Sequence, residues 1–371
     1  MKIFAGNSNH DLALRIAKHL GMTLGDMVCG RFSDHECHVQ INENVRKEDC
    51  YVIQSTTLSK TGSPNDNLME LAIIVDALQR GSANTVTVVI PCYGYQRQDR
   101  KDTSRAPISA RLVATILESI QVDRVICMDL HAGQIQGFFR SQTPVDNLFA
   151  ENDLIDYIKD NILPKYKKED LVVVSPDEGG IKRASRVGEK LHTGIAVIHK
   201  ERSKPGIVNS MTLLGDVKGK ICLLVDDMID SSGTACRAAN LLKEHGATHI
   251  YMLVCHLILS GPAIERIEKS DFTEVIGTNS VECRFDRENV NEDANNVVRS
   301  SNSKIVYVDA SWLISTAIKR AQSGDSLKEL YDKGLTRQSI SPINYPPKNS
   351  RYEVRSERIQ HVTPKKEEVV C

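Results

Sequence analysis

The chain has 371 residues and a formal net charge of −1, because 47 lysines and arginines are balanced by 48 aspartates and glutamates. This balance argues against a nucleic acid as the main partner, and no apolar run approaches the roughly 20 residues that span a bilayer. The ten cysteines include no CxxC pair, which indicates reduced thiols in a cytoplasmic protein rather than disulfides or a zinc site.

Apolar segments typical of strands alternate with amphipathic segments typical of helices along most of the chain. The predicted strands are 2–5, 51–54, 85–90, 124–130, 171–174, 195–198, 221–225, 249–255 and 304–309. The predicted helices are 9–20, 65–80, 108–120, 180–191, 234–245 and 311–322. This alternation predicts the α/β class, with parallel sheets covered by helices on both faces. The length of the chain is sufficient for two such doubly wound domains.

We expect the chain to divide into two α/β domains, at residues 1–146 and 147–335. A stretch at 283–303 is polar and lacks apolar periodicity, so we interpret it as a surface insert in the second domain. Residues 336–371 hold prolines and many charges. Such a segment buries too little apolar surface to offset its ordering entropy, and we therefore expect a disordered tail.

The segment 221–235, ICLLVDDMIDSSGTA, restricts the possible class of ligand more than any other segment of the chain. Its apolar half predicts a buried strand, and ligands in open α/β sheets bind beyond the carboxyl ends of such strands. Asp226 and Asp227 follow there, and carboxylates accept hydrogen bonds from the hydroxyls of a polyol. A hydroxyl-rich loop at a helix N-terminus, which suits a phosphate, comes next and consists of Asp230, Ser231, Ser232, Gly233 and Thr234. An ordinary βα turn with capping acids is the alternative, but the order of these groups favours a sugar phosphate.

Polar residues also follow three other predicted strands. Arg97 and Gln98 lie in a basic segment after strand 85–90, and guanidinium groups pair with phosphates and stack on bases. His131 follows strand 124–130, and Asp177 follows strand 171–174. Magnesium is held by one or two protein groups together with substrate phosphates. Asp177 therefore suits the role of a metal ligand by itself, whereas His131 suits this role mainly when ATP lies beside it. A solvated basic loop and a structural histidine are the alternatives.

Several segments resemble ribose-phosphate pyrophosphokinases, also called phosphoribosyl pyrophosphate synthetases, in the order of that family. They are CYGYQRQDRKDTSRAPISARLVA, MDLHAGQIQGFF, PVDNLFAE, VVSPDEGGIKRA, IHKER and LLVDDMIDSSGTA. The resemblance extends from residue 2 to about residue 330 and is interrupted by the polar insert. The last segment also resembles the ribose-phosphate signature of type I phosphoribosyltransferases, which implies an architecture of that type.

The resemblance implies an enzyme that transfers the β,γ-diphosphoryl group of ATP to the anomeric hydroxyl of ribose 5-phosphate, with Mg²⁺ as cofactor. The implied ATP-binding residues are Phe32, Asp34, Glu36, Arg97, Gln98 and His131. In the family, Phe32, Asp34 and Glu36 match residues that serve the site of a neighbouring subunit. The metal positions are His131 and Asp177, with Asp129 beside them, and ribose 5-phosphate binds Asp226, Asp227 and residues 230–234. Lys200 and Arg202 match a catalytic pair on a mobile loop, with residues 203–206 as a lid. The family forms hexamers built from dimers, so we expect a homo-oligomer and leave assembly with sister subunits open.

Four departures from the family pattern lie near functional segments. Gly133 stands where many relatives have serine, and residues 140–143 lengthen a turn near the regulatory phosphate and ADP site of the family. Glu178 replaces a small residue, and Leu257 stands where the family often has glycine. Because the implied catalytic segments are intact, we expect altered regulation with retained activity. A non-catalytic regulatory subunit of a synthetase complex is the second hypothesis. A phosphoribosyltransferase, which would need neither IHKER nor the basic nucleotide segment, is the third.

Overall fold

The computed structural model describes residues 1–204, 207–286, 290–293, 297–300 and 303–331, and between residues 201 and 210 its account is limited to the main chain. The tail predicted to be disordered, 336–371, lies outside these residues. Residues 1–334 form one compact unit that holds both large sheets. We keep 1–146 and 147–335 as the proposed domains and call them the N-terminal lobe and the C-terminal lobe.

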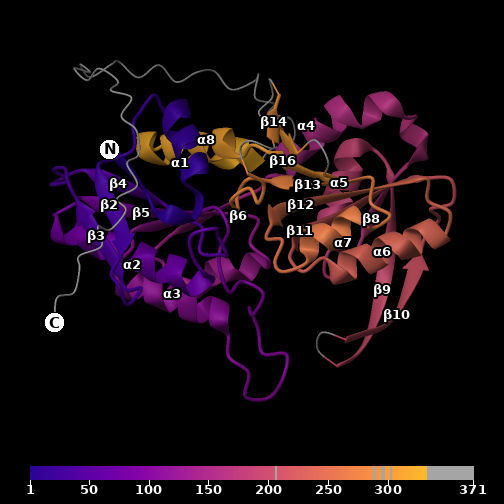
Figure 1. Cartoon of the computed structure of the whole chain (residues 1–371), viewed down its shortest axis with the longest axis horizontal. Helices are drawn as coiled ribbons and strands as arrows, with labels where there is room; N and C mark the ends of the chain where they lie inside the picture. Colours follow the sequence, from indigo (N-terminus) through magenta and orange to yellow (C-terminus); the bar gives the residue numbers. More distant parts are fainter. Residues whose placement is uncertain (205–206, 287–289, 294–296, 301–302, 332–371) are drawn as a thin grey trace, which may run out of the picture. The chain divides into compact units, whose positions relative to one another are not determined.

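The sheet of the N-terminal lobe has five parallel strands. In spatial order they are β1 (Lys2–Ala5), β4 (Asp49–Ile53), β5 (Thr85–Ile90), β6 (Arg124–Met128) and β7 (Val145–Leu148). One face is covered by α2 (Pro64–Arg80) and α3 (Ser109–Ser119), and the opposite face by α1 (His10–His19) and α8 (Ser311–Ser323) (Figure 1). Because both faces are covered, the strands are apolar almost throughout.

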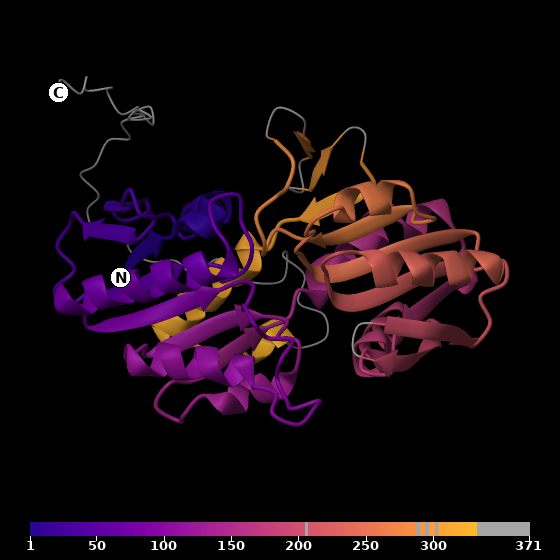
Figure 2. The same ribbon diagram turned by 60° about the horizontal axis from the view of Figure 1, so that its bottom comes forward.

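The sheet of the C-terminal lobe has nine strands, and its central six are parallel. These six are β9 (Gly194–Lys204), β8 (Leu171–Ser175), β11 (Ile221–Ile229), β12 (His249–Leu257), β13 (Glu274–Thr278) and β16 (Ile305–Val308). One face is covered by α4 (Glu151–Asn161) and α5 (Ile181–Leu191), and the other by α6 (Gly233–Glu244) and α7 (Ala263–Glu268) (Figures 1 and 2). The chain leaves β8 toward β9 on one side and returns to place β11 on the other. Such a reversal of strand order opens a crevice for ligands at the carboxyl ends of the strands.

Antiparallel strands close both edges of this sheet. At one edge, β10 (Ile207–Leu214) pairs with β9. At the other edge, β15 (Val298–Ser300) pairs with β16, and β14 (Val290–Glu292) pairs with β15 (Figure 2). The predicted polar insert is therefore not a simple surface excursion, since it adds two strands to the sheet and buries Val297 in the core.

The predicted α/β class with parallel sheets is confirmed, and each predicted strand and helix is present. Strands 2–5 and 85–90 have the predicted ends, and the other elements have shifted ends. The largest extensions are those of β9 and β11. β9 continues to Lys204 because β10 supplies main-chain partners for it, so Lys200 and Arg202 lie in a hairpin rather than in a loop. β11 continues to Ile229, so Asp226 and Asp227 lie within the strand and not beyond it.

Several elements were not predicted. They are the hairpin of β2 (Met27–Arg31) and β3 (Cys37–Ile41), β7, α4, β10, α7, β13, β14, β15 and α9 (Lys328–Tyr331). Short 3-10 helices lie at η1 (Asn7–Asn9), η2 (Gly133–Phe138), η3 (Leu163–Lys165) and η4 (Lys168–Asp170). Among the described residues no helix combines the length and apolarity needed to cross a bilayer. The nine cysteines in that part of the chain are all free thiols.

Contacts between the lobes come from side chains distant in the sequence. Helix α8 follows the second sheet but packs against α1 of the N-terminal lobe. Gln322 of α8 donates to Asp49 (3.0 Å), and Arg15 of α1 forms a two-pronged ion pair with Glu292 of β14. These contacts surround the lobe junction on the side of α1 and α8.

Candidate functional site

A cleft of about 1100 Å³ lies at the carboxyl ends of β6, β8 and β11. Its walls come from the segment after β5 and the end of β6 in the N-terminal lobe, and from α5, β9 and β11 in the C-terminal lobe. The order of the strands in the sheet reverses at β8 and β11, and α/β sheets bind ligands at such a position. Of the residues predicted to act, Arg97, His131, Asp177, Lys200, Asp226, Asp227 and Thr234 line the cleft.

The adjacent acids of β11 have different surroundings. Asp227 is 3% exposed, and its Oδ2 accepts a hydrogen bond from His131 Nδ1 (2.7 Å). Burial opposes ionisation of Asp227, but the hydrogen bond from His131 and the charge of Arg183 hold its pKa below the ordinary value. Burial and the neighbouring charge of Asp227 raise the pKa of Asp226 well above the ordinary value. The pair therefore presents one firmly ionised carboxylate beside one that resists ionisation.

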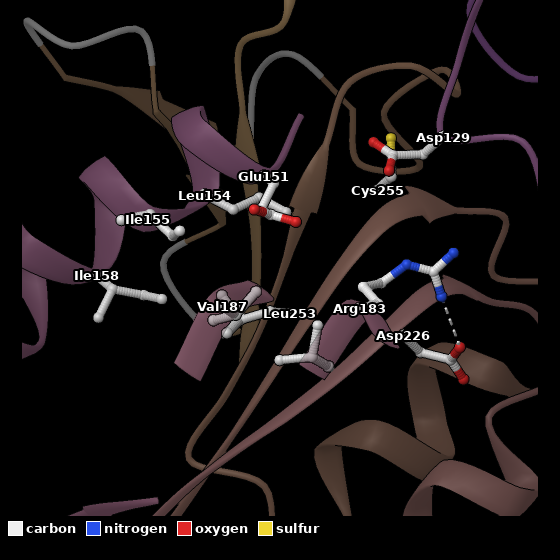
Figure 3. Close-up of a pocket in the computed structure, with 11 residues that line it drawn as sticks. Asp129, Glu151, Leu154, Ile155, Ile158, Arg183, Val187, Asp226, Leu253 and Cys255 are labelled. Carbon is white, nitrogen blue, oxygen red and sulfur yellow. Dashed lines mark ion pairs between the residues drawn. The ribbon is translucent and has the colours of Figure 1, made fainter. Parts of the chain in front are cut away.

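Arg183 of α5 lies between these acids, with its Nη1 3.6 Å from Oδ1 of Asp226 and 3.6 Å from Oδ1 of Asp227. Figure 3 shows this guanidinium beside a second, smaller pocket lined by Glu151, Leu154 and other side chains. That cavity has a volume of about 20 Å³, which is room for about one water molecule. A substrate therefore fits only the larger cleft, and Arg183 forms the wall between the two.

The loop after β11 is tied to the N-terminal lobe by Arg97, whose Nη1 donates to Oδ2 of Asp230 (2.8 Å). Oδ1 of Asp230 is buried and has no hydrogen-bond partner in the described part of the chain. Ser232 has a left-handed backbone (φ 60°), and its hydroxyl donates to the carbonyl oxygen of Ala263 instead of capping α6. The first turn of α6 thus lacks a side-chain cap, and uncapped N–H groups at a helix N-terminus suit a phosphate.

The opposite wall carries the predicted catalytic lysine. Lys200 on β9 is only 6% exposed at its side chain, and its Nζ lies 3.4 Å from Oδ2 of Asp177. Oδ1 of Asp177 accepts the N–H of Gly180 (3.1 Å), which fixes the loop after β8. Next to this pair, His199 Nδ1 lies 2.6 Å from Oε1 of Glu178. An ion pair between Lys200 and Asp177 and a contact between His199 and Glu178 therefore join the loop after β8 to β9.

His131 and Asp177 line the same cleft. The carboxylate of Asp177 is the kind of oxygen ligand that a magnesium ion takes together with phosphates and water, whereas the nitrogen of His131 is not. Asp129 is not brought together with them, because it does not line the cleft and its Oδ2 accepts the N–H of Ala150 (2.8 Å). Within the described residues no three His, Cys, Asp or Glu side chains are grouped to hold a metal. A metal at this site would therefore depend on ligands from the substrate.

Other residues predicted to act lie outside the cleft. Phe32, Asp34 and Glu36 form the turn between β2 and β3, where Phe32 is 54% exposed and packs edge-on against His38. Gln98 accepts a hydrogen bond from the hydroxyl of Ser109. The main chain of Arg202 pairs with Val208 in the β9–β10 hairpin, and its side chain lies outside the described structure. From the loop after β11, residues 230–233 do not line the cleft.

Three residues of the site were missed by sequence reasoning. Arg183 joins the two acids, buried Gln96 accepts the N–H of His131 (2.9 Å), and His256 reaches the end of β6. The terminal position of His256 in an apolar strand was the one available signal. Gln96 and Arg183 looked like ordinary polar residues of a loop and a helix.

Two family models and two similar proteins agree on the relationship of this chain. Residues 1–120 match the N-terminal domain of ribose phosphate pyrophosphokinase, and residues 203–332 match the phosphoribosyl synthetase-associated domain. The chain is 45% identical over 331 residues to ribose-phosphate pyrophosphokinase A of Dictyostelium discoideum, covering 89% of this chain and 98% of that protein. The crystal structure of phosphoribosylpyrophosphate synthetase from Mycobacterium smegmatis is 37% identical and has a TM-score of 0.76, covering 87% of this chain and 99% of that one. The chain therefore belongs to the ribose-phosphate pyrophosphokinase family.

Proposed function

We propose that this enzyme transfers the β,γ-diphosphoryl group of ATP to the anomeric hydroxyl of ribose 5-phosphate, giving 5-phosphoribosyl 1-pyrophosphate and AMP. The observation that carries the proposal is the meeting of two sets of groups in one cleft. Asp226 and Asp227 lie on one wall, and Lys200 with Asp177 lies on another. The acids suit the hydroxyls of a ribose, and the lysine suits a phosphoryl group.

Ribose 5-phosphate is proposed to lie along the end of β11. Its ring hydroxyls donate to Asp226 and Asp227, and its phosphate meets the uncapped first turn of α6 at residues 230–234. The uncapped main-chain N–H groups of this turn support the placement, because they can donate to a phosphate. Arg183 keeps the two acids together against their mutual repulsion.

ATP is proposed to lie on the opposite side, between Arg97 and Lys200, with Gln98 near its nucleoside. The anomeric oxygen attacks the β-phosphorus while the bond from that phosphorus to the oxygen of AMP breaks, and the hydroxyl loses its proton as the new bond forms. Lys200 and Arg202 stabilise the charge on the moving group, which demands positioning more than covalent help. Magnesium, held by Asp177 beside His131, would neutralise and orient the phosphates.

The remaining assignments are also proposals. The exposed turn with Phe32, Asp34 and Glu36 would complete the nucleotide site of a neighbouring subunit in a homo-oligomer, such as a hexamer built from dimers, and sister subunits could join it. The free thiols support a reducing, cytoplasmic location.

The decisive test uses the pure protein with ATP, magnesium and ribose 5-phosphate, and follows AMP over time. We expect AMP to form only when the sugar phosphate is present, and Asp227→Asn to reduce its formation by about 10²-fold or more. A protein that makes no AMP alone but changes the rate of an active synthetase would be the regulatory subunit instead. A phosphoribosyltransferase would consume 5-phosphoribosyl 1-pyrophosphate in the presence of a base.

A further inference from the structure

The end of β6 makes a strained turn before it reaches the cleft. Asp129 has φ +40°, a conformation that costs free energy in a residue with a side chain and persists only where its surroundings impose it. His131, two residues later, carries the imidazole that contacts Asp227. Three buried side chains supply the hydrogen bonds that hold this turn, and they are Gln96, Asn147 and His256.

Of these three side chains, Gln96 acts directly on His131. It is 2% exposed, and its Oε1 accepts the backbone N–H of His131 at 2.9 Å. Within the described structure, the hydrogen-bond acceptor of its Nε2 is Sγ of Cys92, at 4.0 Å. The main hydrogen bond of this buried amide is therefore the one that its oxygen accepts from His131. Burial of a polar group without a good partner costs free energy, so this hydrogen bond matters for the placement of the amide.

The backbone around Gln96 is constrained to present it in this way. A side chain at Gly94 would place its Cβ 2.1 Å from the carbonyl oxygen of Thr56, and Tyr95 has φ +60°. This tight turn buries Gln96 and leaves Arg97 exposed to reach Asp230 in the C-terminal lobe. This turn thus supports two of the contacts between the lobes near the cleft. Gln96 holds the main chain of His131, which contacts Asp227, and Arg97 itself contacts Asp230.

We propose that Gln96 is a positioning residue for the reaction, which holds His131 so that its imidazole meets Asp227 across the cleft. The inference deepens the proposed diphosphoryl transfer and rests on it. Without the acceptor, the N–H of His131 must shift toward water or toward another partner. A displacement of about 1 Å at groups that orient substrates can cost about 10²-fold in rate.

The test compares Gln96→Met with a matched control, Gln54→Met. Gln54 is 1% exposed, and its Oε1 accepts the backbone N–H of Ser8 at 3.0 Å, but it does not line the cleft. Both substitutions remove a buried acceptor and keep the side-chain volume, so both should lower the melting temperature. We expect only Gln96→Met to lower kcat for AMP formation, by about 10–100-fold, with less than about 3-fold change in the KM for ATP. Gln54→Met should stay within about 2-fold of wild type in kcat.

A second variant and a direct structural measurement complete the test. Gln96→Glu keeps an acceptor oxygen, and we expect it to recover at least about a third of the wild-type kcat. Hydrogen exchange of the His131 amide should accelerate by at least about 10-fold in Gln96→Met and remain slow in Gln54→Met. Equal kcat losses in the two methionine variants, or unchanged exchange at His131, would overturn the proposal. If the wild-type protein formed no AMP while the exchange result held, the proposed function would fail and the tie between Gln96 and His131 would stand.

Discussion

Nδ1 of His131 lies 2.7 Å from Oδ2 of Asp227, and this contact joins the end of β6 in the N-terminal lobe to β11 in the C-terminal lobe. The hydrogen bond with Asp227 raises the pKa of His131 against the effect of burial, and it lowers the pKa of Asp227. Each group therefore favours the charged form of the other. Asp226, one residue earlier, receives no such partner from the N-terminal lobe in the described structure. Burial and the charge of Asp227 therefore raise the pKa of Asp226.

Asp226→Asn should stabilise the ligand-free protein at neutral and alkaline pH. Because the folded-state pKa of Asp226 lies above its unfolded value, the stability contributed by its protonated form is present at low pH and is lost as the pH rises through the folded pKa. We expect a gain of about 0.5–2 kcal/mol for the variant at pH 8 and a smaller one at pH 5, together with a large loss of activity. Chemical denaturation at the two pH values measures this, and a variant no more stable than wild type at pH 8 would contradict it.

How much of the site was predictable depends on whether a residue acts through a local pattern. Asp226 and Asp227 follow a run of apolar residues, so their place in the carboxyl-terminal half of a buried strand could be predicted from the sequence, although not that the strand continues to Ile229. Arg183 could not be found, because its role depends on a contact between α5 and β11 that no spacing along the chain encodes. The same is true of Gln96, which follows β5, because its partner His131 follows a different strand, β6.

The errors in the fold have a similar cause. The predicted loop after residue 198 is a strand because β10 supplies its hydrogen bonds, and pairing between strands outweighs local polarity. The insert was interpreted as a surface excursion because of its polar composition, yet Arg299 of β15 pairs with Glu274 (3.2 Å) and its Nη2 donates to the hydroxyl of Tyr157 (2.6 Å). Tertiary partners of this kind give structure to segments whose own sequence shows no periodicity.

Lys200→Met should abolish most of the activity and leave the fold intact. Its buried ammonium group meets Asp177 at the cleft, and loss of one electrostatic stabiliser typically costs about 10²–10³ in rate. Lys190→Met is the matched control, because Lys190 is also largely buried and pairs with Glu151 at 2.7 Å, away from Asp177. Steady-state AMP formation and thermal melting should be measured together. Comparable rates for the two variants would refute a catalytic role for Lys200.

Glu178→Gln should have a small effect, confined to the β9–β10 hairpin. The pair of Glu178 and His199 is exposed, at 69% and 42% of the two side chains, and exposed ion pairs contribute only about 0–1 kcal/mol. We therefore expect kcat to fall by no more than about 5-fold and limited proteolysis within residues 199–214 to accelerate. A loss as large as that of Lys200→Met would show that Glu178 contacts substrate itself.

Arg183→Gln should weaken the binding of ribose 5-phosphate more than that of ATP. The guanidinium is the positive charge placed 3.6 Å from both Asp226 and Asp227, and without it the two acids repel each other and move apart. We expect the KM for ribose 5-phosphate to rise by about 10-fold, which corresponds to about 1.4 kcal/mol, while the KM for ATP changes by less than about 3-fold. Arg183→Lys should recover only part of this loss, since an ammonium is a single point charge that cannot replace the planar fork.

The control for Arg183 lies one turn along the same helix. Arg186 donates from Nε to Glu151 (2.9 Å) and borders the cleft without contacting either acid, so Arg186→Gln removes an equal charge from the same wall. If both variants raised the KM for ribose 5-phosphate equally, the effect would come from the loss of positive charge in the cleft as a whole. If only Arg183→Gln did so, the contacts with the two acids would account for it, because they are what distinguishes the two arginines at this site.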